Sequence, residues 1–207
     1  MIPGMEDTYR TLEGPCEGLW KVKGSKHFGY GFPIETEADV SHLLQTLRKE
    51  HHSARHVAYA WRLGHDDIHQ RWSDDGEPSN SAGPPIFGVI RAHDLTHVLF
   101  AVVRYFGGTK LGVGGLIQAY RDATVEALNQ GNIVTRIRTE PCRILFSYEH
   151  MGTAMGLIKT WGLEPLHSVF ELSCSVEVQV RLSEVTRFIQ AVEETRCLEI
   201  QLGFTRS

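Results

Sequence analysis

The chain has 207 residues, of which 42% are hydrophobic and 22% charged, and its formal net charge is −4. This length allows one or two domains, and the composition is that of an ordinary folded protein. The small negative charge excludes a global electrostatic attraction to nucleic acid or to an anionic membrane. Any contact with nucleic acid would therefore need a local basic patch.

The cysteines and the apolar segments indicate the cellular compartment. Cys16, Cys142, Cys174 and Cys197 are scattered without a CxxC pair, which favours reduced thiols. The first residues, MIPGMEDTYR, contain no apolar signal segment, and the run VLFAVV is too short to span a bilayer. We therefore expect a cytoplasmic protein without membrane contact. The sequence does not indicate an oligomeric state.

Residues 1–140 are predicted to form a mixed α+β domain, because short strand-like runs alternate with two helical patterns. In chain order its elements are strand-like pieces broken by glycine (19–34), a helix capped by Thr36 (37–52), a strand (56–64), a polar loop (64–85), a segment that fits a helix or a strand (86–93), a continuous apolar strand (96–106) and a helix (116–132). The apolar strand is expected to be buried on both faces of a sheet.

Residues 141–207 are predicted to form a second, ferredoxin-like domain, with the junction at Pro141. Its elements are a strand (142–149), a helix (151–161), a weaker strand (163–172), a strand (175–182), a helix that Ser183 would cap (183–195) and a strand (198–204). The order βαββαβ is the ferredoxin-like plan. The apolar–polar alternation predicts a sheet with helices on one face and water on the other.

The segment RYFGGTKLGVGGLIQAY, residues 104–120, places five glycines around one lysine between a strand and a helix. Such a turn exposes backbone N–H groups beside the positive end of a helix dipole, which suits a phosphate or a carboxylate. The candidate residues for an anion or RNA site are Arg104, Gly107, Gly108, Lys110, Gly112, Gly114, Gly115 and Arg121. Two alternatives stay open. Gly114 and Gly115 could serve only close helix packing, or the turn could be a catalytic phosphate loop, although it matches neither GxxxxGK[ST] nor GxGxxG.

The segment WSDDGEPSNSAGPP gathers Asp74, Asp75 and Glu77 around Gly76. Three interpretations are open for this acidic loop. Its carboxylates could bind a divalent metal or act as acid and base. They could only shape the turn through hydrogen bonds to the loop backbone. Or they could pair with Lys110 or Arg104 and hold the two loops together as one surface.

The histidines and serines carry no specific catalytic signature. His52 and His56, and His65 and His69, are four residues apart, but neither pair has the glutamate of HExxH. A nucleophile elbow GxSxG is absent from the sequence. We therefore expect no metal site, no catalytic residues and no cofactor.

Three segments together resemble one family: ARHVAYAW (54–61), SDDGEPSNSAGPPI (73–86) and VVRYFGGTKLGVGGLIQAY (102–120). They are similar to the signature of the IMPACT family, whose bacterial branch is called YigZ. The family usually has glycine and threonine where this chain has Asn80 and Ser81. The resemblance implies an N-terminal domain like the second domain of a small-subunit ribosomal protein, followed by a domain like a late domain of elongation factor G.

The resemblance also implies a role in translation control, since eukaryotic relatives restrain a starvation-responsive initiation-factor kinase by competing for its activator. We expect a non-catalytic regulator that binds RNA, the ribosome or a translation-related protein through the glycine-rich loop. Two alternatives stay open. One is a small-molecule enzyme that uses the glycine loop for phosphate and the acidic loop for metal or acid–base work. The other is an adaptor that binds only protein.

Overall fold

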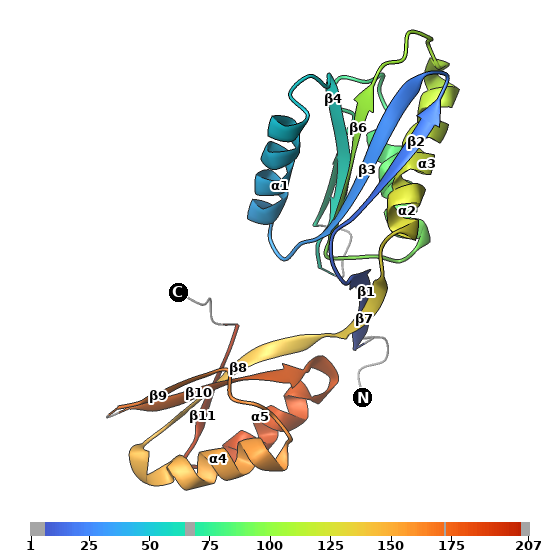
Figure 1. The fold of residues 1–207 in the computed structure, drawn as a ribbon. Helices are drawn as coiled ribbons and strands as arrows, with labels where there is room; N and C mark the ends of the chain where they lie inside the picture. The colour runs from blue at the N-terminus through green and yellow to red at the C-terminus, as the bar shows by residue number, and fades with distance from the viewer. Residues whose placement is uncertain (1–6, 65–68, 172, 204–207) are drawn as a thin grey trace. The chain divides into compact units, whose positions relative to one another are not determined.

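The structure, a computed structural model, describes residues 7–64, 69–171 and 173–203. The chain divides into two compact units, which are treated separately below. The N-terminal unit comprises Tyr9–Arg136, and the C-terminal unit begins at Ile137 and includes Asp7 and Thr8. Both units combine sheets with helices (Figure 1), which confirms the α+β fold class expected from the sequence.

The N-terminal unit is built on an antiparallel sheet with the strand order β2-β3-β6-β4-β5. Its strands are β2 (Cys16–Val22), β3 (Ser25–Pro33), β6 (Val98–Tyr105), β4 (His56–Arg62) and β5 (Gln70–Ser73). The central strand β6 is buried from Val98 to Val103, as the continuous apolar run predicts for a strand covered on both faces. Strand β1 (Thr8–Leu12) pairs with β7 (Ile133–Ile137) in a small sheet of its own.

Helices cover both faces of this sheet (Figure 1). Helix α1 (Glu37–Glu50) packs on one face through Val40 and Leu47, and a capping box between Thr36 and Asp39 begins it. Helices α2 (Gly83–Ala92) and α3 (Gly112–Asn129) lie on the other face. The unit is therefore a three-layer α/β/α arrangement with a separate core on each side of the sheet.

Two elements of this unit, β5 and α2, differ from what the sequence predicts for residues 64–93. The predicted loop 64–85 contains strand β5, which forms the edge beside β4, so that a polar sequence without clear alternation still completes the sheet. The ambiguous segment 86–93 belongs to a helix that begins earlier, at Gly83, with proline in its first turn. Proline is tolerated there because the first N–H groups of a helix have no internal acceptor.

The C-terminal unit has the element order β8 (Thr139–Phe146), α4 (Met151–Thr160), β9 (His167–Phe170), β10 (Cys174–Arg181), α5 (Val185–Glu194) and β11 (Glu199–Leu202). The strand order is β11-β8-β10-β9, and every pairing is antiparallel. This is the predicted ferredoxin-like βαββαβ arrangement. Its core joins Val176, Val178 and Val180 of β10 to Ile158 of α4 and Phe188 of α5.

The junction between the units differs in detail from the expected position at Pro141. The units separate between Arg136 and Ile137, and Pro141 lies inside β8 opposite Gln179. The pairing of β11 with β8 ends at Cys142, so β8 has a single neighbour at Pro141 and a missing N–H is tolerated there. Ser183 also differs from the expected cap, because its hydroxyl and its N–H both donate to Asp7 while α5 starts two residues later.

Candidate functional site

Arg104 at the end of β6 and Glu77 of the acidic loop form a buried ion pair. The guanidinium Nη1 donates to Oε1 of Glu77 at 2.6 Å, and the hydroxyl of Tyr120 on α3 donates to the same oxygen at 2.8 Å. Burial raises the pKa of Tyr120, and the neighbouring Glu77 charge raises it further, so the phenol stays protonated. This is the pairing that the third interpretation of the acidic loop predicts, and it joins that loop to the strand before the glycine turn.

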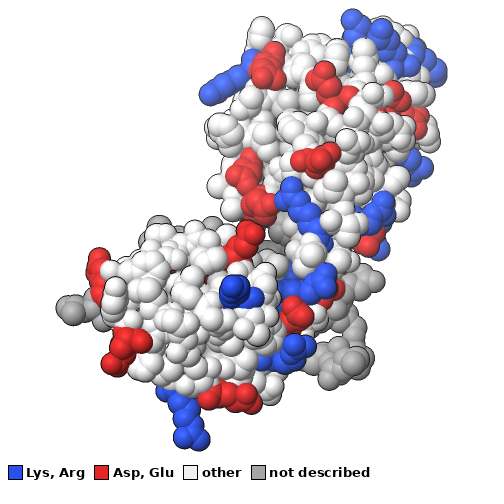
Figure 2. All heavy atoms as spheres, turned by 60° about the horizontal axis from the view of Figure 1, so that its bottom comes forward, with Lys and Arg blue, Asp and Glu red and all other residues white. Residues whose placement is uncertain are grey.

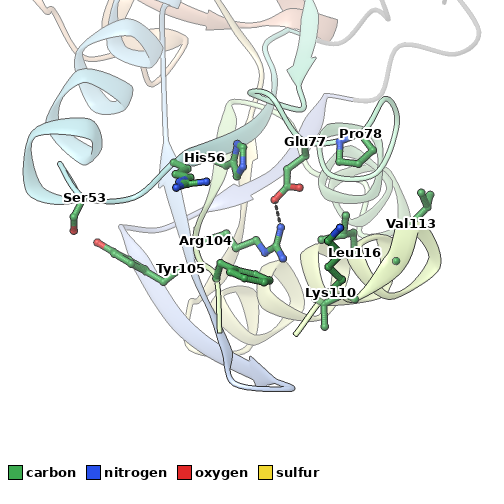
Figure 3. Close-up of a pocket in the computed structure, with 13 residues that line it drawn as sticks. Ser53, His56, Glu77, Pro78, Arg104, Tyr105, Lys110, Val113 and Leu116 are labelled. Atoms are coloured by element: carbon green, nitrogen blue, oxygen red, sulfur yellow. Dashed lines mark hydrogen bonds and ion pairs between the residues drawn. The ribbon is translucent and has the colours of Figure 1, made fainter. Parts of the chain in front are cut away.

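A cavity of about 800 Å³ opens beside this ion pair (Figure 3). Its walls come from the α1–β4 connection, the acidic loop, the end of β6 and the start of α3. The lining residues are Ser53, Arg55, His56, Glu77, Pro78, Arg104, Tyr105, Phe106, Lys110, Leu111, Gly112, Val113 and Leu116. Three stretches far apart in the sequence, 53–56, 77–78 and 104–116, thus contribute to one concave surface, as ligand-binding cavities commonly require.

The other two carboxylates of the acidic loop bind to the protein itself. Asp74 accepts the N–H groups of Asn80, Ala82 and Gly83 at 2.8 Å each, so its charge lies at the start of α2. It satisfies N–H groups that a helix leaves free and interacts favourably with the helix dipole. Asp74 therefore shapes the turn, as the second interpretation of the loop predicts.

Asp75 fastens the acidic loop to two other elements. Its carboxylate accepts two hydrogen bonds from Arg48 of α1, at 2.9 and 3.2 Å, and one from the N–H of Val57 at 2.7 Å. Burial would raise the pKa of Asp75, but the Arg48 guanidinium and the Val57 N–H outweigh it and hold that pKa below its usual value. His56 contacts the Asp75 carbonyl through Nδ1 at 2.8 Å.

The glycine-rich turn has three positions whose backbone favours glycine: Gly107, Gly108, which has a φ of +89°, and Gly112. A Cβ atom at Gly107 would lie 1.9 Å from the carbonyl carbon of Gly24, so the turn passes directly against the β2–β3 connection. Gly112, the first residue of α3, has a φ of +73°, which favours glycine. A Cβ atom at Gly114 would have no neighbour within 4 Å, and one at Gly115 would meet Leu111 at 3.1 Å. Close packing on the sheet therefore does not account for Gly114.

The mouth of the cavity carries positive charge that carboxylates do not offset. Among the residues that the structure describes, neither Lys110 nor Arg55 has an ion-pair partner, and both are exposed. Helix α3 begins there without a side-chain acceptor for its first N–H groups in the described part of the chain. Exposed Lys21, Lys23 and Lys26 lie on the β2–β3 hairpin. Figure 2 shows Lys and Arg side chains gathered at one end of the N-terminal unit.

Aromatic surface lies among these cations. The Phe106 ring is 58% exposed, and the Arg104 guanidinium carbon lies 5.7 Å from its centroid. Tyr105 lines the cavity next to it and also borders a smaller one of about 370 Å³, which Lys26 and Phe28 help to form. The site therefore offers cations, free helix N–H groups and an exposed aromatic face within one concave region.

His27 lies under this site and is fully buried. It sits on β3 opposite Arg104, with its ring 5.4 Å from that of Tyr120, and neither ring nitrogen has a hydrogen-bond partner among the described residues. Burial, together with the nearby Arg104 charge, lowers the pKa of His27 to about 4. The imidazole is therefore neutral at physiological pH and adds no charge to the site.

The structure brings together some of the candidate residues for the anion site and leaves others outside. Arg104, Lys110 and Gly112 line the cavity, whereas Gly107, Gly108, Gly114, Gly115 and Arg121 are not among its lining residues. Sequence reasoning missed Arg55, His56, Phe106 and Tyr120. The segment containing Arg55 and His56 belongs to the family signature, but no spacing in the sequence connects it with a loop fifty residues later.

The histidine pairs do not form a metal centre in the described residues. In those parts of the chain, no group of three or more His, Cys, Asp or Glu side chains is arranged to hold a metal ion. His65 lies outside the described residues. Likewise, no helix in the described segments is long and apolar enough to cross a membrane.

Fold and cavity together define a two-unit α+β protein whose larger unit carries a cavity beside the glycine-rich turn, with basic side chains at its mouth. A family model described as the Impact N-terminal domain matches residues 23–128. The chain therefore belongs to the IMPACT family, which confirms the resemblance of its three sequence segments.

Individual relatives agree with this assignment. The IMPACT family member YvyE of Bacillus subtilis is 41% identical over 132 residues, which are 64% of this chain and 61% of the relative. The IMPACT family member YigZ of Escherichia coli is 40% identical over 89 residues, 42% of this chain and 44% of the relative. The matches thus span less than two thirds of these relatives. A crystal structure of a hypothetical protein covers 98% of this chain and 100% of its own, with a TM-score of 0.74 at 23% identity, and shares the two-unit fold.

The two departures from the usual family sequence fit the loop geometry. Asn80 has a φ of +63°, a left-handed conformation that glycine adopts freely and that asparagine tolerates better than most residues. The buried Ser81 donates its hydroxyl to the Pro78 carbonyl at 2.6 Å, a bond that a threonine hydroxyl could also make. The loop thus keeps its shape with these residues.

Proposed function

We propose that this protein is a non-catalytic, translation-associated module that binds single-stranded RNA at the cavity between the acidic loop and α3. The observation that carries the proposal is the composition of the cavity mouth. Lys110 and Arg55 have no ion-pair partner among the described residues, and Phe106 exposes its ring beside them. Single strands are bound by cations that contact phosphates and by aromatic rings that stack on bases.

The ion pair beneath the mouth supports this assignment. Since Arg104 is neutralised by Glu77, the charge available to an RNA phosphate comes from Lys110, Arg55 and the start of α3. The Arg104–Glu77–Tyr120 contacts then act as a rigid base that fixes the glycine turn against the acidic loop. Membership of the IMPACT family, with its link to translation control, supports ribosomal or messenger RNA as the class of ligand.

Binding of a fluorescently labelled single-stranded RNA, measured by anisotropy over a range of salt concentrations, tests the proposal. We expect salt-dependent binding, and we expect Lys110→Glu to weaken it and to reduce the salt slope by about one. Arg121→Glu is the matched control, because Arg121 is exposed on α3 but is not a lining residue. Absence of binding at low salt, or an equal loss in both variants, would overturn the proposal.

The enzyme alternative rests on Glu77, the one acidic residue among those that line the cavity of the described structure. Asp74 and Asp75 are held by backbone N–H groups and by Arg48, which leaves them poorly placed to bind a metal. Thermal unfolding with nucleotides, with and without Mg²⁺, separates the two functions. A nucleotide-specific stabilisation that Glu77→Gln abolishes would favour the enzyme. Recovery of a stoichiometric protein without RNA from cells would favour an adaptor.

A further inference from the structure

A second cavity, of about 640 Å³, lies beside α1 at the β2 edge of the N-terminal sheet. In β3 the side chain of His27 faces α3, whereas Tyr30 and Phe32 pack with the residues under α1. The cavity is lined by Pro15, Cys16, Glu17, Tyr30, Phe32, Leu43, Thr46, Leu47, Glu50 and Gln130. It is distinct from the proposed RNA site, with which it shares no lining residue.

The walls of this second cavity are mostly apolar and aromatic. Leu43, Thr46, Leu47 and Glu50 follow the spacing i, i+3, i+4, i+7, so they share one face of α1. On β3 the rings of Tyr30 and Phe32 stack with centroids 6.4 Å apart and an interplanar angle of 11°. The Tyr30 hydroxyl bonds to Nε2 of His51 at 2.8 Å, which fixes the ring in place.

The charge in this cavity is entirely negative. Glu17 lies opposite Tyr30 on the neighbouring strand β2, and Glu50 ends α1. Neither carboxylate has an ion-pair or hydrogen-bond partner among the described residues, and the lining contains no lysine or arginine. Burial is the largest cause that raises the pKa of Tyr30, and the negative charges of Glu17 and Glu50 raise it further. Both carboxylates therefore lie close enough to the Tyr30 ring to interact with it electrostatically.

We propose that this cavity binds an arginine or lysine side chain from a basic polypeptide segment of a partner protein. The apolar stem of a long cationic side chain can pack on aromatic rings. Its charged head can interact with the ring faces and with carboxylates at the same time. The cavity begins at Pro15, Cys16 and Glu17, where β2 forms the edge of the sheet. An extended segment can therefore lie along the β2 edge by strand addition while one side chain enters the cavity.

Calorimetric titration of the full chain with a hexa-arginine peptide at low salt tests this assignment, with a hexa-glutamate peptide as the charge-reversed probe. We expect hexa-arginine to bind, hexa-glutamate not to bind, and the double variant Glu17→Gln/Glu50→Gln to raise the Kd about tenfold. The control Glu37→Gln/Glu193→Gln makes the same change in net charge at exposed residues outside the cavity, and its Kd should stay within about twofold. Chemical shift changes at Glu17 and at Leu43–Glu50 should mark the bound position.

Three kinds of result would overturn the assignment. The first is equal affinity for hexa-arginine in the double variant and in the control variant, or no binding at all. The second is binding of arginine amide as tightly as of hexa-arginine, which would indicate a small amine instead of a polypeptide. The third is a dimer in sedimentation that the double variant dissociates, because the occupant would then be a second copy of the chain. None of these results bears on RNA binding, which uses the other cavity.

Discussion

Arg104 and Glu77 are joined by an ion pair whose two side chains are only 10% and 4% exposed. Twenty-seven residues separate them in the sequence, and their contact fixes the acidic loop to the central strand of the larger sheet. In such a buried pair each charge is tolerated because the other is present. This relationship determines which of the cations near the glycine turn remain available to a ligand.

Replacing Glu77 by glutamine should destabilise the protein by about 3 kcal/mol, because it leaves the Arg104 charge buried without its partner. The double variant Glu77→Leu/Arg104→Met should recover part of this loss, since neither charge then remains. Urea unfolding measures both free energies, and Glu37→Gln serves as an exposed control. A loss below about 1 kcal/mol for Glu77→Gln would show that the pair contributes little.

Replacing Asp74 by alanine should reduce the free energy of unfolding by about 1–2 kcal/mol, because Asp74 accepts three backbone N–H groups at the start of α2. Asparagine at this position should retain part of the effect, since its carbonyl oxygen can still accept. Urea unfolding of the two variants provides the comparison. If Asp74→Ala lost no more stability than Asp74→Asn, the acceptor oxygen that asparagine keeps would contribute nothing, which would contradict this expectation.

His27 should make the protein less stable as the pH falls below about 6.5. Its pKa is about 4 in the folded state, compared with about 6.5 in the unfolded chain, so the unfolded state binds more protons between these values. The contribution is fully present above pH 6.5 and reaches a loss of about 3 kcal/mol near pH 4. In His27→Leu this part of the pH dependence should disappear. Parallel stability curves for both proteins from pH 7 to pH 4.5 would contradict it.

Two glycines of the same turn should respond oppositely to alanine. Gly107→Ala places a methyl group against the backbone of Gly24 and Ser25 and should lower the melting temperature clearly. Gly114→Ala lies in the first turn of α3 with open space around the new Cβ, and should stabilise by up to about 1 kcal/mol. Thermal unfolding measures both changes. A destabilising Gly114→Ala would restore the interpretation that this glycine serves close packing.

Phe106→Ala should weaken RNA binding about tenfold while leaving the salt slope unchanged, because stacking contributes about 1–3 kcal/mol per base without releasing counterions. Because the Phe106 ring is 58% exposed, its removal should cost little stability. The unfolding transition of the variant should therefore match that of the wild-type protein. Anisotropy titrations at several salt concentrations separate the two effects. Unchanged affinity at every salt concentration would contradict a stacking role for Phe106.

The sequence by itself determined the class of fold and the family. Local periodicity identifies the main elements of the C-terminal unit, because β8 and β10 alternate and α5 has its own apolar stripe. The signature segments around DDGEP and RYFGG are long enough to identify the IMPACT family. They also located the two loops that meet in the structure.

Tertiary structure alone decided how the charges pair. Sheet order places His27 and His56 on either side of Arg104, and the loop closure brings Glu77 to it, leaving Lys110 without an ion-pair partner among the described residues. Arg121 is separated from the cavity lining by its position on α3, which no local pattern specifies. Strand β5 was also beyond local prediction, because its pairing with β4 and not its own alternation makes it a strand. Such contacts depend on distant segments meeting, and sequence periodicity records only neighbours along the chain.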